Sequence, residues 1–272
     1  MKAYLSLIAI DLKLALRLRT VIFFNYLFPI IFFFAFGTFI RAGQSVENVT
    51  MVVNMSVTLG ILGNGLFGAG IRTLQEREMN ILRRYKVTPI SPGPLLVSSM
   101  VTGWIIFLPY ILLLLAMSHA IYHMPWPTHM VALIAFISLA LVTFRAIGLV
   151  IASVANNMQE GTILVQLMYF PMLFLSGATF PLQYGPAILR IISRFIPATY
   201  LVDGIKQVII QGGGFPWAAA GALIVTMAVG MTVSIKLFRW EKEEKIRGSA
   251  KLWVLAVLLP FVVMGVLQWI HR

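Results

Sequence analysis

The sequence predicts an all-α fold, a polytopic bundle of transmembrane helices with six core spans and a seventh, C-terminal span. The first observation is composition: 60% of the 272 residues are hydrophobic and 11% are charged, whereas soluble domains have about 45–50% apolar and about 25% charged residues. The second is that the apolar residues form runs of about 20, enough for a helix to cross a hydrocarbon core roughly 30 Å thick. The third is that Lys and Arg lie between these runs, as is typical of membrane-protein loops.

Residues 1–20 are predicted to form an amphipathic helix in the membrane interface. Four polar residues share one stripe of this helix: Lys2, Ser6, Lys13 and Arg17. Four apolar residues form the facing stripe: Leu5, Ile8, Leu12 and Leu16. A basic helix of this kind lies among lipid headgroups. The alternative is a solvated start to the first span. A signal peptide is not expected, because Asp11 and Lys13 interrupt the apolar stretch.

The apolar runs define the core spans. These are residues 21–40, 51–71, 95–117, 130–154, 162–178 and 215–237. A further apolar run at 252–270 is predicted to be a seventh span, within an additional C-terminal segment at 252–272. Its rival is a helix in the inner interface. The preceding residues, 1–251, are assigned to one transmembrane domain.

Residues 179–211 interrupt this pattern with three prolines and four charged residues: Pro181, Pro186, Pro197, Arg190, Arg194, Asp203 and Lys206. A full crossing by such a segment would be costly. We predict a re-entrant hairpin of two short helices that meet at Pro197 and enter the membrane without crossing it. Irregular backbone survives at membrane depth only where protein surrounds it or a cavity lies beside it.

The distribution of basic residues predicts the orientation. With the N-terminus in the cytoplasm, the inner segments hold about three times as many Lys and Arg as the outer ones, as the positive-inside rule requires. The net charge of +12 therefore reflects topology rather than binding to nucleic acid. We expect a multi-pass protein of a cell membrane, specifically the bacterial inner (cytoplasmic) membrane.

Two short motifs resemble ligand-binding sites, but their positions in the chain favour structural roles. Residues 63–68 match G-x-G-x-x-G, but they lie inside a predicted span, where small residues allow close helix packing. His119, His123 and His129 lie near one loop without thiolate or acidic ligands, so we predict an aromatic belt with Tyr122 and Trp126 rather than a metal site. The chain has no cysteine and no G-x-x-x-x-G-K-[ST] phosphate loop. We therefore expect no nucleotide, cofactor or metal on this chain.

Arg145 lies well inside the fourth predicted span. A charge at this depth is costly, and it faces either the bundle interior or snorkels to the interface. The sequence leaves both alternatives open, a functional cavity residue or a snorkelling one. Asn25, Asn54 and Asn64 are polar groups in spans, for which we expect hydrogen bonds between helices.

Residues 72–90 are predicted to form a coupling segment on the cytoplasmic face, a short amphipathic helix from residue 74 to 86. At about 100° per residue, one side carries Leu74, Glu78, Ile81, Leu82 and Tyr85, and the other carries Glu76, Asn80, Arg83 and Arg84. Pro89 and Pro92 stop the helix, because Pro disfavours helix in the preceding residue. The alternative is a solvated loop, but amphipathicity and the firm stop favour a docking element. Eight residues are its predicted contacts: Glu76, Arg77, Glu78, Asn80, Leu82, Arg83, Arg84 and Tyr85.

Two stretches of this sequence carry a resemblance to a known family. The first is Glu76-Arg77-Glu78 followed by Ile81-Leu82-Arg83-Arg84 and Val87-Thr88-Pro89-Ile90-Ser91-Pro92, and the second includes Gly177, Phe180, Pro181, Pro197, Tyr200 and Asp203. They resemble, respectively, the cytoplasmic coupling segment and the re-entrant extracellular hairpin of the type-2 family of ABC transporter permeases, especially its drug- and antibiotic-export branch. Two departures are Lys206, where the family more often has Arg, and the run 252–270, which lies beyond the family's usual end.

The resemblance implies a permease subunit of an ATP-driven exporter. Such a permease pairs with a second copy or a paralogue, and two ATP-binding subunits dock below. ATP binding and hydrolysis then move a lipophilic or amphiphilic substrate out of the cytoplasm or inner leaflet. The chain itself is then not an enzyme, and ATP and Mg²⁺ belong to the partner subunit. Membrane lipid is the remaining partner.

The alternative function is a secondary transporter or channel that does not use ATP. Ion-coupled transporters often carry acidic residues within their spans. The nine acidic residues of this chain all lie at or outside the predicted span ends: Asp11, Glu47, Glu76, Glu78, Glu160, Asp203, Glu241, Glu243 and Glu244. This distribution disfavours ion coupling.

Overall fold

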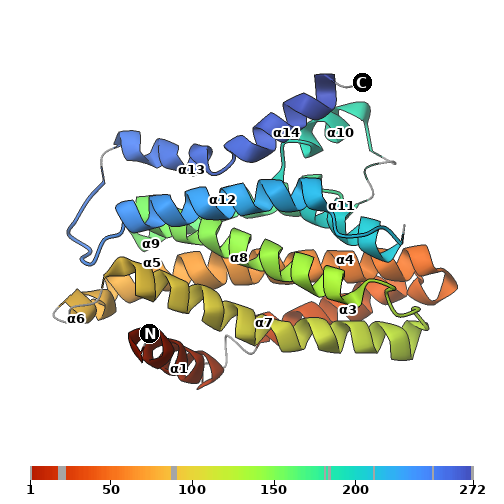
Figure 1. Cartoon of the computed structure of the whole chain (residues 1–272), viewed down its shortest axis with the longest axis horizontal. Helices are drawn as coiled ribbons and strands as arrows, with labels where there is room; N and C mark the ends of the chain where they lie inside the picture. The colour runs from red at the N-terminus through yellow and green to blue at the C-terminus, as the bar shows by residue number, and fades with distance from the viewer. Residues whose placement is uncertain are drawn as a thin grey trace.

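The computed structural model describes residues 2–17, 23–86, 91–180, 182, 185–210, 212–246 and 248–270. Its regular elements in these ranges are all helices, so the all-α prediction is confirmed there. The helices run roughly parallel to the long axis of the molecule (Figure 1). The helices α5 (Arg72–Glu78) and α6 (Ile81–Lys86) lie near one end of this bundle, and we call it the α6 end (Figure 1). Residues 18–20 of the predicted interfacial helix and residues 271–272 lie outside the described ranges.

Four helices among the described residues are long and apolar enough to cross a membrane. The first is a continuous rod, Val46–Glu78, made of α4 (Val46–Leu62), a π-helix η3 (Gly63–Ile71) and α5 (Arg72–Glu78). The others are α7 (Pro92–Tyr122), α8 (Met130–Val154) and α12 (Trp217–Lys236). They agree with the second, third, fourth and sixth predicted spans.

The first and fifth predicted spans contain shorter helices. The π-helix η1 (Phe23–Leu27) leads into α3 (Phe28–Phe39), and α9 covers Met158–Leu175. The apolar helix Asn25–Phe39 is shorter than a full crossing requires. The count of six core spans therefore stays a prediction for these two.

Helix α8 is the centre of the bundle, and it contacts α4, η3, α7, α9, α11 (Pro197–Ile209) and α12. Its closest neighbour is η3, whose glycines let the two backbones touch. A Cβ at Gly65 would lie 2.8 Å from Phe144 Cβ, and one at Gly70 would lie 2.8 Å from the carbonyl oxygen of Gly148. The prediction that the glycine-rich second span packs closely against another helix is confirmed.

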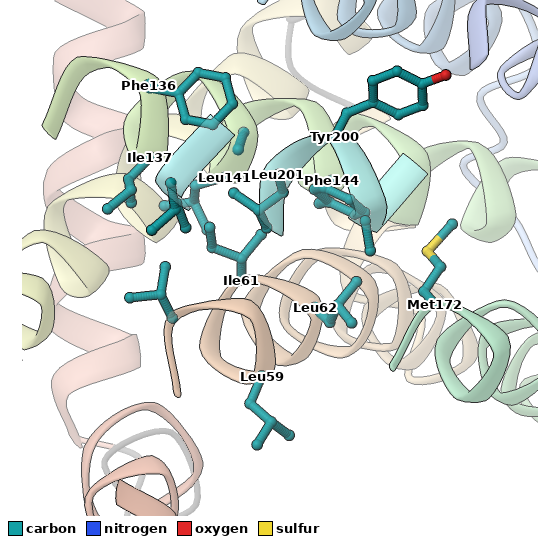
Figure 2. Close-up of a cluster of buried hydrophobic side chains, with 14 of the residues drawn as sticks. Leu59, Ile61, Leu62, Phe136, Ile137, Leu141, Phe144, Met172, Tyr200 and Leu201 are labelled. Atoms are coloured by element: carbon teal, nitrogen blue, oxygen red, sulfur yellow. The ribbon is translucent and has the colours of Figure 1, made fainter. Parts of the chain in front are cut away.

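The main apolar core lies between α4, α8, α9 and α11 (Figure 2). Leu62, Phe144 and Leu201 are almost completely buried there. Tyr200 of α11 is also buried, and its hydroxyl donates a hydrogen bond of 2.8 Å to the carbonyl oxygen of Arg194. This core joins the rod to the segment that follows α9.

That segment contains two short helices, α10 (Ala187–Ser193) and α11 (Pro197–Ile209), which meet in a tight turn before Pro197. The Thr199 hydroxyl donates a 2.7 Å hydrogen bond to the carbonyl oxygen of Ser193 and closes this turn. The helical arrangement is the one predicted. The re-entrant position of the hairpin in the membrane stays a prediction.

The C-terminal apolar run is not a single helix. It forms a 3₁₀ turn η5 (Gly248–Leu252), then α13 (Trp253–Ala256) and α14 (Leu259–Ile270), with the break next to Pro260, as expected of a residue that lacks an N–H donor. Phe261 is fully buried, with its ring centroid 5.4 Å from that of Tyr200. The run therefore packs along the bundle toward the hairpin turn (Figure 1). Whether it spans the membrane stays a prediction.

Helix α1 (Lys2–Arg17) packs along α7. Its buried side chains are Leu7 and Ala15, with Asp11 half-buried between them, whereas Leu5 and Leu16 of the predicted apolar stripe are exposed. The face toward the protein is thus offset from the predicted apolar stripe. Its placement at the membrane interface stays a prediction.

Candidate functional site

The predicted coupling segment is two helices rather than one. Helix α5 ends at Glu78, and α6 (Ile81–Lys86) begins after a break at Met79 and Asn80. Asn80 has a positive φ of 57°, and Asn tolerates this left-handed conformation better than most residues do. The expectation of one helix from 74 to 86 was therefore wrong, because the amphipathic pattern continues across the break. Residues 87–90 lie outside the described ranges.

Arg77 faces the protein interior and is only 3% exposed. Its guanidinium donates hydrogen bonds of 3.0 Å to the carbonyl oxygen of Ala152 and 2.6 Å to that of Ala155. These carbonyls lie at the C-terminal end of α8, where the last turn lacks donors within the helix and favours positive charge. Arg77 therefore joins the rod to the end of α8.

Apolar contact strengthens the same junction. Leu74 of α5 is fully buried, and a Cβ added at Gly161 of α9 would overlap its Cδ1 atom. Gly161 thus leaves the space that Leu74 fills. The rod, α8 and α9 meet at this point.

Glu78 points to the start of α9. Its carboxylate accepts a 3.3 Å hydrogen bond from the backbone N–H of Met158. Asn157 caps the same helix by accepting from the N–H of Glu160 at 2.8 Å, and the Glu160 carboxylate accepts from the N–H of Asn156 at 3.0 Å. The turn between α8 and α9 is therefore fixed at both helix ends.

Arg239 completes the junction, and sequence reasoning missed it. Only 7% exposed, it donates 3.0 Å hydrogen bonds to the carbonyl oxygen of Ser153 and to Asn156 Oδ1, and it also donates to the carbonyl oxygen of Ala155. Burial lowers the pKa of this guanidinium, and Glu244 and Glu160 oppose the shift. In the sequence it belongs to a charged run typical of a solvated linker.

Much of the outward surface of the segment is basic. Arg83, Arg84 and Lys86 are exposed, and so is Met79. Leu82, one of the eight predicted docking contacts, is 1% exposed and already packs within the chain. Tyr85 is half-buried, and burial raises the pKa of its hydroxyl.

A second polar cluster joins α1 to the base of the segment. Arg72 Nη2 lies 3.2 Å from Asp11 Oδ1, and Arg72 Nε lies 2.9 Å from Glu76 Oε1. The Ser98 hydroxyl of α7 donates a 2.9 Å hydrogen bond to Asp11 Oδ2. One carboxylate therefore connects α1, α5 and α7.

Arg145 points into the bundle rather than toward an interface, and it is 3% exposed. Its guanidinium donates to the backbone and side-chain oxygens of Asn64 in η3, and to the carbonyl oxygen (2.6 Å) and hydroxyl (2.9 Å) of Ser99 in α7. Asn64 in turn donates a 2.7 Å hydrogen bond to Asn25 Oδ1 in η1. The snorkelling alternative does not describe this structure, and the expected hydrogen bonds between helices are present.

The residues predicted for the hairpin do not form one cluster. Pro197 and Tyr200 are buried, whereas Phe180 is 63% exposed and Asp203 is also exposed. Gly177 has a φ of 82°, which favours glycine. Pro181 lies outside the described residues.

The surface also carries an apolar groove of about 400 Å³ between α7, α8 and α12. Eight residues line it: Val97, Met100, Val101, Trp104, Ser138, Leu139, Val142 and Met227. Within the described part of the chain, no group of three His, Cys, Asp or Glu side chains is placed to hold a metal ion.

Three relatives show what the chain is similar to. The inner membrane transport permease YhhJ of Escherichia coli (strain K12) is 24% identical over 195 residues, 71% of this chain and 51% of that protein. The linearmycin resistance permease protein LnrN of Bacillus subtilis (strain 168) is 24% identical over 180 residues, 64% of this chain and 46% of that protein. The probable multidrug ABC transporter permease YbhS of E. coli (strain K12) is 22% identical over 162 residues, 59% of this chain and 43% of that protein.

The chain spans about half the length of these curated relatives. The conserved pattern of one family, described as ABC-2 family transporter protein, matches residues 44–236. This match includes the rod with Arg77, helix α8 with Arg145, and the two short helices of the predicted hairpin, whereas Arg239 lies beyond it. Together with the four apolar helices, it shows that this multi-pass membrane protein belongs to the ABC-2 family of transporter proteins.

Proposed function

We propose that this chain is the permease subunit of an ATP-driven exporter, and that a separate ABC subunit binds and hydrolyses ATP with Mg²⁺. One observation carries the proposal: an exposed basic helix, α6, follows a rod that is bonded at its base to the central helix α8 through Arg77. Force applied to α6 would reach the membrane helices through this junction.

The length of the rod supports this geometry. A helix of about 20 residues crosses the hydrocarbon core, whereas the rod has 33. With Val46 near one interface, Arg72 and the residues after it project beyond the other. We assign the α6 end to the cytoplasm, where the excess of Lys and Arg belongs, and the hairpin to the outer side of a bacterial inner membrane.

The substrate class we propose is lipophilic or amphiphilic. The names of LnrN and YbhS, a linearmycin resistance permease and a probable multidrug permease, support it. So does the apolar groove, which opens on the surface formed by α7, α8 and α12.

A second permease copy or a paralogue completes the transporter in this proposal. Two exposed apolar stripes at helical spacing offer a surface for it. On η1 and α3 the stripe is Phe23, Leu27, Ile31 and Phe34, and on α9 it is Ile163, Leu167, Phe170 and Phe174. Membrane lipid covers any part of these stripes that a partner does not.

The deciding experiment is reconstitution with an ABC ATP-binding subunit encoded beside this chain. ATP hydrolysis should require the partner, and export of a lipophilic probe should require both subunits and ATP. Saturable hydrolysis by the chain alone would contradict the proposal. Transport driven by an ion gradient without ATP would support a secondary transporter instead.

A cysteine in place of Phe180 tests the orientation. The native chain has no cysteine, and this side chain is 63% exposed. A membrane-impermeant thiol reagent should label it from outside the cell. Labelling from the cytoplasmic side alone would reverse the assigned topology.

A further inference from the structure

The linker that follows α12 lies beyond the family match, which ends at residue 236. Its residues 239–246 form a loop fixed at both ends by one side chain. Arg239 Nη1 donates a 3.0 Å hydrogen bond to Asn156 Oδ1, and the N–H of Ile246 donates a 2.9 Å bond to the same oxygen. Arg239 also donates across the loop to the carbonyl oxygen of Glu244 at 2.6 Å. We call residues 239–246 the pinned loop.

The other side of the pinned loop contacts α6. Lys86 Nζ lies 3.0 Å from Glu241 Oε1 and 3.7 Å from Glu244 Oε1, and Arg83 Nε lies 4.0 Å from Glu241 Oε1. The hydrogen bond between Lys86 and Glu241 raises the pKa of the lysine and lowers that of the glutamate. Both groups therefore stay charged across the neutral range.

Each of these ion pairs is exposed and weak by itself. They are more effective here because the hydrogen bonds to Asn156 already fix the backbone of the loop, so pairing orders only the side chains. Asn156 itself lies in the turn between α8 and α9, and Arg77 donates a hydrogen bond to the carbonyl oxygen of the preceding residue, Ala155. Helix α6 is thus linked to α8 twice, through α5 and through the pinned loop.

We propose that the pinned loop is a second transmission element, a brace that keeps α6 fixed relative to the α8–α9 turn throughout the transport cycle. The inference rests on the proposed function, because α6 is taken to receive force from the ATP-binding subunit. Without the brace, α6 could pivot at the Met79–Asn80 break, and motion at the partner would be lost before it reached α8.

The isolated chain tests the contact itself. A zero-length carbodiimide reagent, which joins an amine to a carboxylate in direct contact, should link Lys86 to Glu241 in the native chain, and the Glu241→Gln variant should not form this link. Absence of the Lys86–Glu241 link in the native chain would overturn the brace. This result does not depend on any ATP-binding subunit.

The assembled transporter tests the role. Glu241→Lys should reduce transport per ATP hydrolysed by roughly three- to tenfold, because it removes two exposed pairs and places a repulsive charge beside Lys86. Glu243→Lys is the matched control. It makes the same charge change at an exposed position of the loop that forms no ion pair with the described residues, and it should leave transport unchanged. Adding Lys86→Glu to Glu241→Lys should restore part of the loss.

Two results would overturn the proposal. One is an equal effect of Glu241→Lys and Glu243→Lys. The other is a cross-linked transporter that binds its partner but no longer turns over, since a loop that must release α6 is not a brace. Failure of the proposed function would look different, because the unsubstituted chain would then bind no ATP-binding subunit.

Discussion

The buried arginines along α8 are held in two different ways. Arg145, in the body of the helix, bonds to side-chain and backbone groups of η3 and α7 at membrane depth. Arg77 and Arg239 bond mainly to backbone carbonyls at the C-terminal end of the helix. A helix C-terminus attracts positive charge, whereas the middle of a helix in lipid offers no such stabilisation.

The difference separates two mechanical roles. The Arg145 network fixes how η3, α7 and α8 pack, and Gly103 leaves the space that the guanidinium occupies. A substitution in this network therefore disturbs the packing of the bundle. The junction of Arg77 and Arg239 lies outside the main apolar core, beside the small cluster of Leu74, Ala152 and Ala155, and it connects the bundle to α6. We therefore expect changes at Arg145 to affect folding, and changes at the junction to affect coupling more than folding.

The largest loss of stability is expected for Gly103→Val in α7. A Cβ at Gly103 would overlap the guanidinium of Arg145, which would lose its bonds to Ser99 and Asn64. An uncompensated buried charge costs about 3–5 kcal/mol. The yield of folded protein and its thermal unfolding in detergent measure the effect. Gly221→Val in α12, at an exposed position where a Cβ meets nothing within 4 Å, is the control and should behave like the native chain.

Arg77→Met should have a smaller effect on stability and a larger one on coupling. The variant leaves the carbonyl oxygen of Ala152 without this donor, at a cost of about 1–3 kcal/mol. Thermal unfolding of the isolated chain should shift downward, and the assembled transporter should hydrolyse ATP with less transport. Arg84→Met, at an exposed position of α6, should leave unfolding of the isolated chain unchanged. Equal unfolding temperatures for the two variants would contradict the junction.

Gly265→Leu tests whether α14 holds the hairpin turn. A Cβ there would lie 2.8 Å from Phe195 Cδ1 and 3.0 Å from the carbonyl oxygen of Arg194, so a larger side chain must push α14 away from the turn. Overpacking of this kind costs about 1–3 kcal/mol. Hydrogen exchange at residues 194–200 should become faster, whereas Val263→Leu, at an exposed position of α14, should change nothing. Unchanged exchange in both variants would show that α14 does not restrain the hairpin.

The sequence predicted the elements that depend on local composition. The apolar runs gave four of the long helices, and the glycines of the second span indicated its contact with α8, because close packing in lipid requires small residues. The break at Asn80 was not predicted, because the amphipathic pattern continues across it and does not reveal a single residue in the left-handed conformation.

The polar partners were harder to predict, because they join residues far apart in the chain. Arg77 and Arg239 are separated by more than 150 positions, and both bond to the carbonyl oxygen of Ala155, which has no side-chain signature. Arg145 stood out as a charge in an apolar run, yet its partners in η3 and α7 followed only from the packing. The pattern of a single sequence indicates where a buried charge is costly, but it does not identify the hydrogen-bond partners that stabilise the charge.

The smallest effect is expected for Asp11→Asn, which tests whether α1 belongs to the same unit as the rod. Asparagine keeps the volume and one acceptor oxygen for Ser98, but it removes the charge that pairs with Arg72. The two side chains are 15% and 24% exposed, but Arg72 keeps its other partner, Glu76, so no unpaired charge is left and the loss should be about 1 kcal/mol. A spin label on Leu5, which is exposed on α1, should become more mobile as the helix separates from α7 part of the time. Lys13→Gln changes the charge of the same helix at an exposed position and should leave the mobility of the label unaffected.

Because Arg72 still pairs with Glu76 at 2.9 Å, α5 should keep its place even when α1 moves. Equal label mobility in all three chains would show that α1 is held by Leu7 and Ala15 alone, and that Asp11 carries no connection between the N-terminal helix and the coupling segment.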